Sequence, residues 1–190
     1  MSHELRTPLN AILGFAQLLA GDPARHGDER LQTYLREVLR AGRHLLELIN
    51  DVLDLARVEA GGVAMRIEPV PLQAVVDDGL RLLEPLARER RLDWPAPGTI
   101  AADWVVEADR MRLMQVLLNL LSNAIKYNRE GGRVEVAVED DGDTLCLRVS
   151  DTGLGMEPAQ LARLFHAFDR LGAEHSGVQG AGIGLVLSKR

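Results

Sequence analysis

The chain has 190 residues, of which 46% are hydrophobic and 4% aromatic, and its formal net charge is -6 at pH 7. This composition predicts one or two soluble globular domains with aliphatic cores, and it argues against a broad basic surface for nucleic acid. A single cysteine, Cys146, excludes an internal disulfide and a cysteine-based zinc site. No apolar run reaches the ~20 residues that span a bilayer. These features fit a cytoplasmic chain, whose parent protein can still be anchored in a membrane.

Two segments with a heptad pattern open the chain. In residues 3–20, apolar side chains recur at alternating spacings of four and three, and the same rhythm fills residues 28–60. Gly61-Gly62 ends the second segment. Two such helices joined by a short turn form a helical hairpin, which buries both faces well only against a second copy. We therefore expect residues 1–62 to form a homodimeric four-helix bundle.

The periodicity changes in residues 63–190 and predicts helices grouped with an antiparallel or mixed sheet, which is an α+β fold. Asp109 is expected to cap a helix, and Asp140-Asp141-Gly142-Asp143 reads as the turn of a β-hairpin. The expected elements are a strand at 63–70, a helix at 72–91, a short strand at 104–107, a helix from 110 to about 127, and hairpin strands at 133–138 and 144–149.

Polar residues recur along the expected helix at 110–127. Asn119, Asn123 and Tyr127 follow one another at intervals of four, and Lys126 lies three residues after Asn123. These side chains share one face, and the core face is expected to carry Leu117, Leu121, Ala124 and Ile125. Periodicity alone explains the polar face equally well as an ordinary solvated surface. An amide oxygen can also bind Mg²⁺ without adding negative charge beside a triphosphate, and a lysine supplies positive charge for phosphate.

An acidic residue and two glycines follow the expected hairpin. Asp151 ends its second strand, and Gly153 and Gly155 allow a tight turn and the close approach of a ligand. A carboxylate at this place can accept a hydrogen bond from an amino group such as that of adenine. The pattern alone is weak, because most Asp-x-Gly-x-Gly stretches are plain turns.

Alternate glycines near the end of the chain precede another helix. Gly180, Gly182 and Gly184 lie before or at its expected start near Ile183, where backbone N–H groups can bind phosphate. A dinucleotide-binding fingerprint needs a preceding strand and G-x-G-x-x-G spacing, so it does not fit this segment.

A histidine stands near the start of the first helix. His3 is followed by Glu4, and Thr7 lies one turn further on the same face. A neutral imidazole nitrogen is a competent nucleophile toward a phosphoryl group near pH 7. It reacts better when its other nitrogen gives its proton toward a carboxylate. Taken alone, a helical histidine is more often a surface residue.

In this order, the segments resemble the transmitter core of a sensor histidine kinase. Residues 2–10, Ser-His-Glu-Leu-Arg-Thr-Pro-Leu-Asn, match its dimerisation and phosphoacceptor motif. The later segments look like the boxes of the ATPase superfamily that includes gyrase, Hsp90 and MutL. They are the N box at 119–127, the G1 box at 151–155, the F box at 165–170 and the G2 box at 180–185.

The resemblance implies roles for the phosphoacceptor residues. His3 would be autophosphorylated from ATP, and its phosphoryl group would pass to an aspartate of a response regulator. Glu4 would orient or deprotonate the ring. Thr7 would position water for removing phosphate from the regulator, and Leu13 and Gly14 would contact it.

The resemblance also implies that residues 63–190 form an α/β-sandwich ATP-binding domain of the Bergerat type. Asn123 would be the Mg²⁺ ligand, Asp151 would read adenine, and Arg170 would lie near the γ-phosphate. Phe165 and Phe168, whose spacing also predicts core packing, would anchor a mobile lid at 171–180. The remaining site residues would be Asn119, Lys126, Tyr127, Gly153, Gly155, Gly180, Gly182 and Gly184.

The chain departs from the family pattern at its ends and at Ala181, where the family often has Thr or Ser. The first helix of the family usually begins well before the histidine, and its ATP-binding domain continues past the G2 box. We therefore expect a core clipped at both ends. Two alternatives stay open: another ATPase of the superfamily, and a non-kinase module for dimerisation or regulator dephosphorylation. His3→Ala separates the first from a kinase, because an ATPase should survive that substitution.

Overall fold

The structure is a computed structural model, and its described residues form two compact units. One unit comprises Met1–Gly62 with His166–Ile183, and the other comprises Val63–Phe165 with Gly184–Arg190. In the first helix, side chains are described from Thr7 to Leu19. The described residues are 2–20, 30–31, 33–42, 45, 49, 52, 65–142, 144–169 and 182–189.

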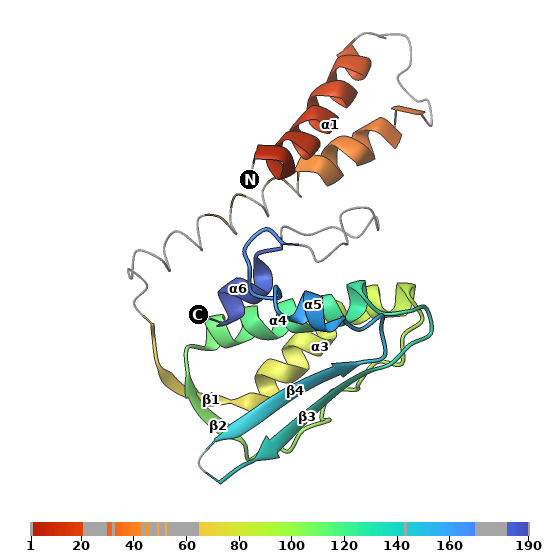
Figure 1. Ribbon diagram of the computed structural model, residues 1–190. Coiled ribbons are helices and arrows are strands. Elements are labelled where there is room, and N and C mark those ends of the chain that lie inside the picture. Colours follow the sequence, from red (N-terminus) through yellow and green to blue (C-terminus); the bar gives the residue numbers. More distant parts are fainter. Residues whose placement is uncertain are drawn as a thin grey trace. The chain divides into compact units, whose positions relative to one another are not determined.

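The first unit contains a helical hairpin. Helix α1 spans Ser2–Ala20, and the described residues between 30 and 52 are helical (Figure 1). The rings of Phe15 and Tyr34 stack with centroids 5.5 Å apart. A Cβ at Gly42 would lie 3.8 Å from Ile12 Cδ1. Ile12 thus lies near Gly42, whereas Phe15, further along α1, lies near Tyr34, which comes earlier in the second helix. The two helices therefore run antiparallel, as expected. The expected helix end at Gly61-Gly62 lies outside the described residues.

This hairpin leaves much of its apolar surface uncovered. Six large apolar side chains are 39–55% exposed. They include residues of the heptad pattern, whose burial requires a neighbouring helix. The six are Leu9, Leu13 and Leu18 on α1, and Leu35, Leu39 and Ile49 on the second helical segment.

The second unit contains two antiparallel strand pairs. Strand β1, Glu68–Pro71, pairs with β2, Val105–Ala108. Strand β3, Val134–Asp140, pairs with β4, Leu145–Asp151, in the expected hairpin. Its turn is held by Asp140 Oδ1, which accepts from Gly142 N at 2.8 Å. A parallel bridge between Asp93 and Arg133 links the residue just before β3 to an earlier segment of the chain.

The expected strand at 63–70 is longer than the observed one, because residues 65–67 are not strand. Its partner β2 offers four residues for pairing. In addition, the backbone N–H of Arg66 donates to Asp109 Oδ2 at 3.0 Å instead of joining a ladder. Residues 63 and 64 lie outside the described part.

Helix α3, Leu72–Glu89, and helix α4, Arg110–Lys126, pack against these strands (Figure 1). Asp109 caps α4 as expected, since its Oδ1 accepts from Met111 N at 3.0 Å and from Arg112 N at 3.1 Å. These bonds, and above all the one from Arg66 N, hold the pKa of Asp109 below its ordinary value of 3.8.

The core of this unit lies between the two helices and the strands. It consists of fourteen buried apolar residues, and the predicted core face of α4 is confirmed. Near the end of α3 the side chain of Ala87 is buried, whereas that of Leu86 is 48% exposed. A Cβ at Gly79 would lie 3.1 Å from Leu117 Cδ2, so α3 and α4 approach closely. The α+β class is confirmed. The core residues are Val70, Leu72, Val75, Val76, Leu80, Ala87, Leu92, Ile100, Leu117, Leu121, Ala124, Ile125, Val134 and Val136.

Two short helices complete the described part, α5 at Pro158–Leu161 and α6 at Gly184–Lys189. Core packing of Phe165 is not observed, because this side chain is 43% exposed. Its ring instead faces the Lys189 ammonium group, which lies 4.2 Å from the ring centroid. Within the described residues, no helix combines the length and apolarity that a bilayer span requires.

Candidate active site

The polar face predicted for α4 is present. Asn119, Asn123, Lys126 and Tyr127 are half-buried, whereas the opposite face carries core residues such as Leu121. Alternation of this kind follows from the 3.6-residue period once one face is committed to the core. Four predicted site residues therefore stand along one side of α4 and its C-terminal cap.

A run of hydrogen bonds connects this face with α6. Asn123 Nδ2 donates to Asn119 Oδ1 at 3.5 Å, Asn119 Nδ2 donates to Ser188 Oγ at 2.9 Å, and Ser188 Oγ donates to the carbonyl of Gly184 at 3.0 Å. A Cβ at Gly184 would overlap Asn119 Oδ1. The structure thus brings the predicted G2 segment against the predicted N box. Ser188 takes part in this run of hydrogen bonds, although the sequence did not indicate it as a site residue.

The chemistry of Asn123 fits a magnesium ligand. Its Nδ2 is turned toward Asn119, and among the described residues no donor reaches its Oδ1. The described residues contain no cluster of three or more His, Cys, Asp or Glu side chains that could hold a metal. A cation here would rely on one amide oxygen, with water or phosphate in its other positions. That arrangement suits Mg²⁺, which keeps several waters.

The segment after β4 is fixed against the end of α4. Asp151 Oδ1 accepts from Gly153 N at 2.8 Å, and Leu154 N donates to the carbonyl of Tyr127 at 3.1 Å. A Cβ at Gly153 would overlap that carbonyl and lie 2.7 Å from Asp151 Oδ1. Glycine is therefore required at 153 by close approach. In the described part of the chain, the second carboxylate oxygen of Asp151 has no protein donor and can accept a ligand amino group.

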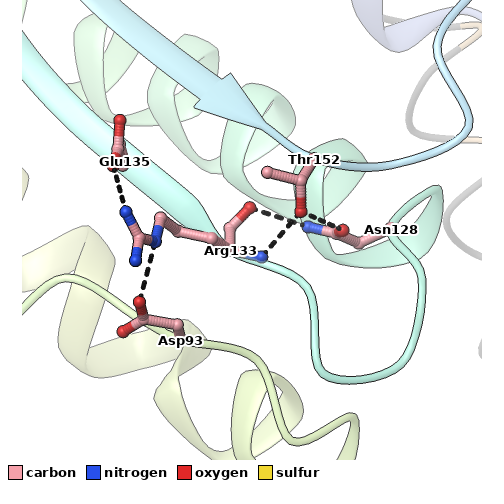
Figure 2. Close-up of polar contacts among 5 residues, drawn as sticks. All are labelled: Asp93, Asn128, Arg133, Glu135 and Thr152. Atoms are coloured by element: carbon pink, nitrogen blue, oxygen red, sulfur yellow. Dashed lines mark hydrogen bonds and ion pairs between the residues drawn. The ribbon is translucent and has the colours of Figure 1, made fainter.

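Asn128, which the sequence did not single out, is central to this arrangement (Figure 2). Its side chain is buried, and its Nδ2 donates to the carbonyl of Arg133 at 3.1 Å. Its Oδ1 accepts from Arg129 N at 3.0 Å and from the Thr152 hydroxyl at 3.4 Å. An asparagine at a helix end just before Gly131-Gly132 reads only as a turn residue, so no local signal could have revealed these contacts.

The side chain of Arg133 points away from that network and forms surface ion pairs (Figure 2). Its Nη1 lies 3.1 Å from Glu135 Oε1, and its Nε lies 2.9 Å from Asp93 Oδ2. Glu135 and then Asp93 raise the pKa of the Arg133 guanidinium, which is charged in any case. All three side chains are well exposed, so these ion pairs contribute little to the stability of the fold.

The predicted phosphoacceptor residues lie on α1. Thr7 is exposed, and the helix places it one turn after His3. The side chains of His3 and Glu4 lie outside the described ones. The same holds for Arg170, Gly180, Ala181 and the expected lid at 171–180. Gly182 is described, with φ +71°, and its carbonyl accepts from Phe168 N at 3.1 Å.

Comparison with protein families identifies both parts of the chain. Residues 1–61 match the His Kinase A (phospho-acceptor) domain. Residues 108–190 match the family described as histidine kinase-, DNA gyrase B- and HSP90-like ATPase.

Proteins with similar sequences occur in Caulobacter and Brucella. The non-motile and phage-resistance protein of Caulobacter vibrioides is 41% identical over 199 aligned positions, which cover 100% of this chain and 23% of the relative. The cell-division control histidine kinase PdhS of Brucella abortus is 39% identical over 202 positions, which cover 100% of this chain and 19% of the relative. The chain therefore spans about a fifth of the length of these proteins.

Solved structures that share the fold include that of a histidine kinase. Histidine kinase AdeS of Acinetobacter baumannii superposes with a TM-score of 0.73 at 26% identity, covering 98% of this chain and 83% of that one. ShkA, solved in complex with AMPPNP, gives a TM-score of 0.67 at 34% identity, covering 98% of this chain and 38% of that one. The chain belongs to the sensor histidine kinases and carries the transmitter core of that family, a phosphoacceptor domain and an ATP-using catalytic domain.

Proposed function

We propose that this core phosphorylates His3 from ATP and passes the phosphoryl group to an aspartate of a response regulator. One observation carries the proposal. The polar face of α4 meets the Gly184 segment at Asn119 and the Asp151–Gly153 segment at Tyr127, in a chain that begins with a phosphoacceptor domain. We assign phosphotransfer to residues 1–62 and nucleotide binding to residues 63–190.

In the nucleotide site, Asp151 reads the adenine amino group with the carboxylate oxygen that Gly153 N leaves open. Asn123 holds Mg²⁺, which supplies charge neutralisation to the triphosphate. Lys126 adds a positive charge, and the glycines give backbone room for phosphate. The full proposed set is Asn119, Asn123, Lys126, Tyr127, Asp151, Gly153, Gly155, Arg170, Gly180, Gly182 and Gly184.

In the transfer step, an imidazole nitrogen of His3 attacks the γ-phosphorus, the bond to the bridging oxygen breaks, and ADP leaves. Glu4 takes the hydrogen bond of the other ring nitrogen and stabilises the ring as it gains positive charge. The carboxylate of the regulator then attacks the phosphohistidine and frees His3. The chemistry depends mainly on positioning and charge, as in other phosphoryl transfers.

We propose a response regulator receiver domain as the partner, and Thr7 as a residue that positions water when the regulator is dephosphorylated. The exposure of Thr7 on α1 suits that role. ThkA, which shares this fold with a TM-score of 0.65 at 24% identity, was solved in complex with a response regulator protein.

A His Kinase A domain implies dimerisation, and we propose that the hairpin forms the homodimer. The exposure of Leu9, Leu35 and Ile49, which belong to the heptad pattern, supports the proposal, because a four-helix bundle would cover them. The cytoplasm is the compartment that we propose for this core, since ATP and the regulator must both reach it.

Calorimetric titration with AMPPNP tests the nucleotide site. We expect Asp151→Ala to weaken binding at least about tenfold, which corresponds to ~1.4 kcal/mol. Asn123→Ala should weaken it only when Mg²⁺ is present. Asp141→Ala, which removes an exposed carboxylate from the β3–β4 turn, is the matched control. Wild-type affinity in both Asp151→Ala and Asn123→Ala would contradict the assignment.

A further inference from the structure

Asn128 connects the end of α4 with the residue before β3 and with the loop after β4. It directly follows Tyr127, it donates to the carbonyl of Arg133 just before β3, and it accepts from the Thr152 hydroxyl. Among the described residues it is the one buried polar side chain, at 7% exposure. A buried amide with both ends bonded fixes its neighbours in one arrangement.

The backbone at Gly132 and Gly153 packs closely against Asn128. A Cβ at Gly132 would overlap Asn128 Oδ1 and lie 2.9 Å from Thr152 Oγ1. A Cβ at Gly153 would lie 3.0 Å from the Asn128 Cα. The two glycines thus let β3 and the 151–155 loop close around this side chain.

Thr152 completes the connection. Its hydroxyl donates to Asn128 Oδ1 and accepts from Arg133 N at 2.9 Å, while its own N–H donates to Arg133 O at 3.1 Å. Arg133 O therefore keeps a donor when Asn128 is truncated. Loss of the amide should loosen the loop without opening the strand pair.

We infer that Asn128 is a positioning residue that holds Asp151 at a fixed place beside α4 and thereby sets the preference of the site for adenine. Asp151 precedes Thr152 directly, so the loop that Asn128 holds carries the carboxylate. The inference rests on the proposed role of Asp151. It adds that adenine selectivity depends on a side chain that touches neither base nor phosphate.

The test compares ATP with purine riboside triphosphate, which lacks the amino group that Asp151 would read. Both are titrated with Mg²⁺ into the full chain in a His3→Ala background, so that no phosphoryl transfer occurs. We expect Asn128→Ala to reduce the preference for ATP about tenfold. Thr152→Val should act in the same direction, Thr152→Ser should retain the wild-type preference, and Arg133→Ala should leave it unchanged.

Equal weakening of both triphosphates in Asn128→Ala and Thr152→Val would overturn the inference, because a general loss of folded protein lowers both affinities alike. If Asn128→Ala fails to fold, the Thr152→Val and Thr152→Ser pair decides the matter alone.

Asp151→Ala separates this inference from the proposed function. If Asp151→Ala loses the ATP preference and Asn128→Ala keeps it, the inference fails and the adenine role stands. If Asp151→Ala keeps the preference, the adenine role fails and the inference fails with it. We expect Asp151→Ala to lose the preference, and Asn128→Ala to cause no further loss in that background.

Discussion

Among the described residues, the two units differ in how many buried apolar residues they contain. The ATP-binding unit encloses fourteen buried apolar residues between α3, α4 and the strands. The helical hairpin leaves six large apolar side chains exposed along its two described segments. A single chain therefore forms the core of the ATP-binding unit, although this unit also leaves ten large apolar side chains exposed. In the described part of the hairpin only Pro8 and Ala41 are buried, as expected of a helix pair that associates with a second copy.

This contrast suits the two halves of the proposed reaction. Recognition of a nucleotide needs side chains held by a closed core, such as the polar face of α4 opposite Leu117 and Leu121. An acceptor histidine must instead meet a nucleotide site and then a separate protein. A hairpin that is stabilised by association with a second copy can present its histidine first to the nucleotide site and then to the other protein.

The largest expected effect is in the core of the ATP-binding unit. Leu121 is fully buried, so Leu121→Ala should lower the free energy of unfolding by about 2–5 kcal/mol. The matched control is Leu82→Ala on α3, where the side chain is 63% exposed and the change should stay within about 0.5 kcal/mol. Urea denaturation measures both. Equal losses for the two variants would remove the basis of the comparison.

Association of the hairpin should respond to a charge on its exposed apolar surface. Leu35→Glu places a charge on a side chain whose remaining 39% exposed surface would be buried in the dimer, where an unpaired charge is costly. We expect a rise of at least tenfold in the dimer dissociation constant, measured by analytical ultracentrifugation. Leu82→Glu, on the other unit, should leave that constant unchanged. A dimer that tolerates Leu35→Glu would place the interface elsewhere.

The nucleotide platform should be sensitive to a single methyl group at Gly153. An alanine there would push against Tyr127 O and Asp151 Oδ1, so Gly153→Ala should weaken AMPPNP binding about tenfold, or ~1.4 kcal/mol. Gly142→Ala is the control, because its φ of +83° brings strain but nothing lies within 4 Å of the added carbon. It should cost about 1–2 kcal/mol of stability and leave nucleotide affinity unchanged. Identical affinities in both variants would argue against close approach at 153.

The smallest effect concerns the cap of α4. The folded-state pKa of Asp109 lies below its ordinary value of 3.8, so this carboxylate stabilises the fold above that pH. Its contribution is lost as the pH falls through the lowered pKa. Asp109→Ala should therefore have a lower free energy of unfolding than wild type at pH 7. The difference between the two should shrink as the pH is lowered. A gap that stays constant down to pH 2 would show that the charge is not the cause.

Features with a local signal could be predicted from the sequence. Asp109 and the apolar period of α4 gave the cap and the core face, and the Asp-Asp-Gly-Asp stretch gave the β3–β4 turn. The contacts of Asn128 with Thr152 and of Asn119 with Ser188 could not be predicted, because they join residues 24 and 69 positions apart. Phe165 was misjudged because spacing alone does not reveal that Lys189 lies over its ring.

The most direct test of the central claim is phosphorylation with ATP labelled at its γ-phosphate, in the presence of Mg²⁺. Wild type is compared with His3→Ala and with His44→Ala, a second histidine of the phosphoacceptor domain. We predict a label that is acid-labile and alkali-stable in wild type and His44→Ala, and that is absent from His3→Ala. A label that persists in His3→Ala would contradict the assignment of the acceptor, and so would a wild-type chain that binds ATP and acquires no label.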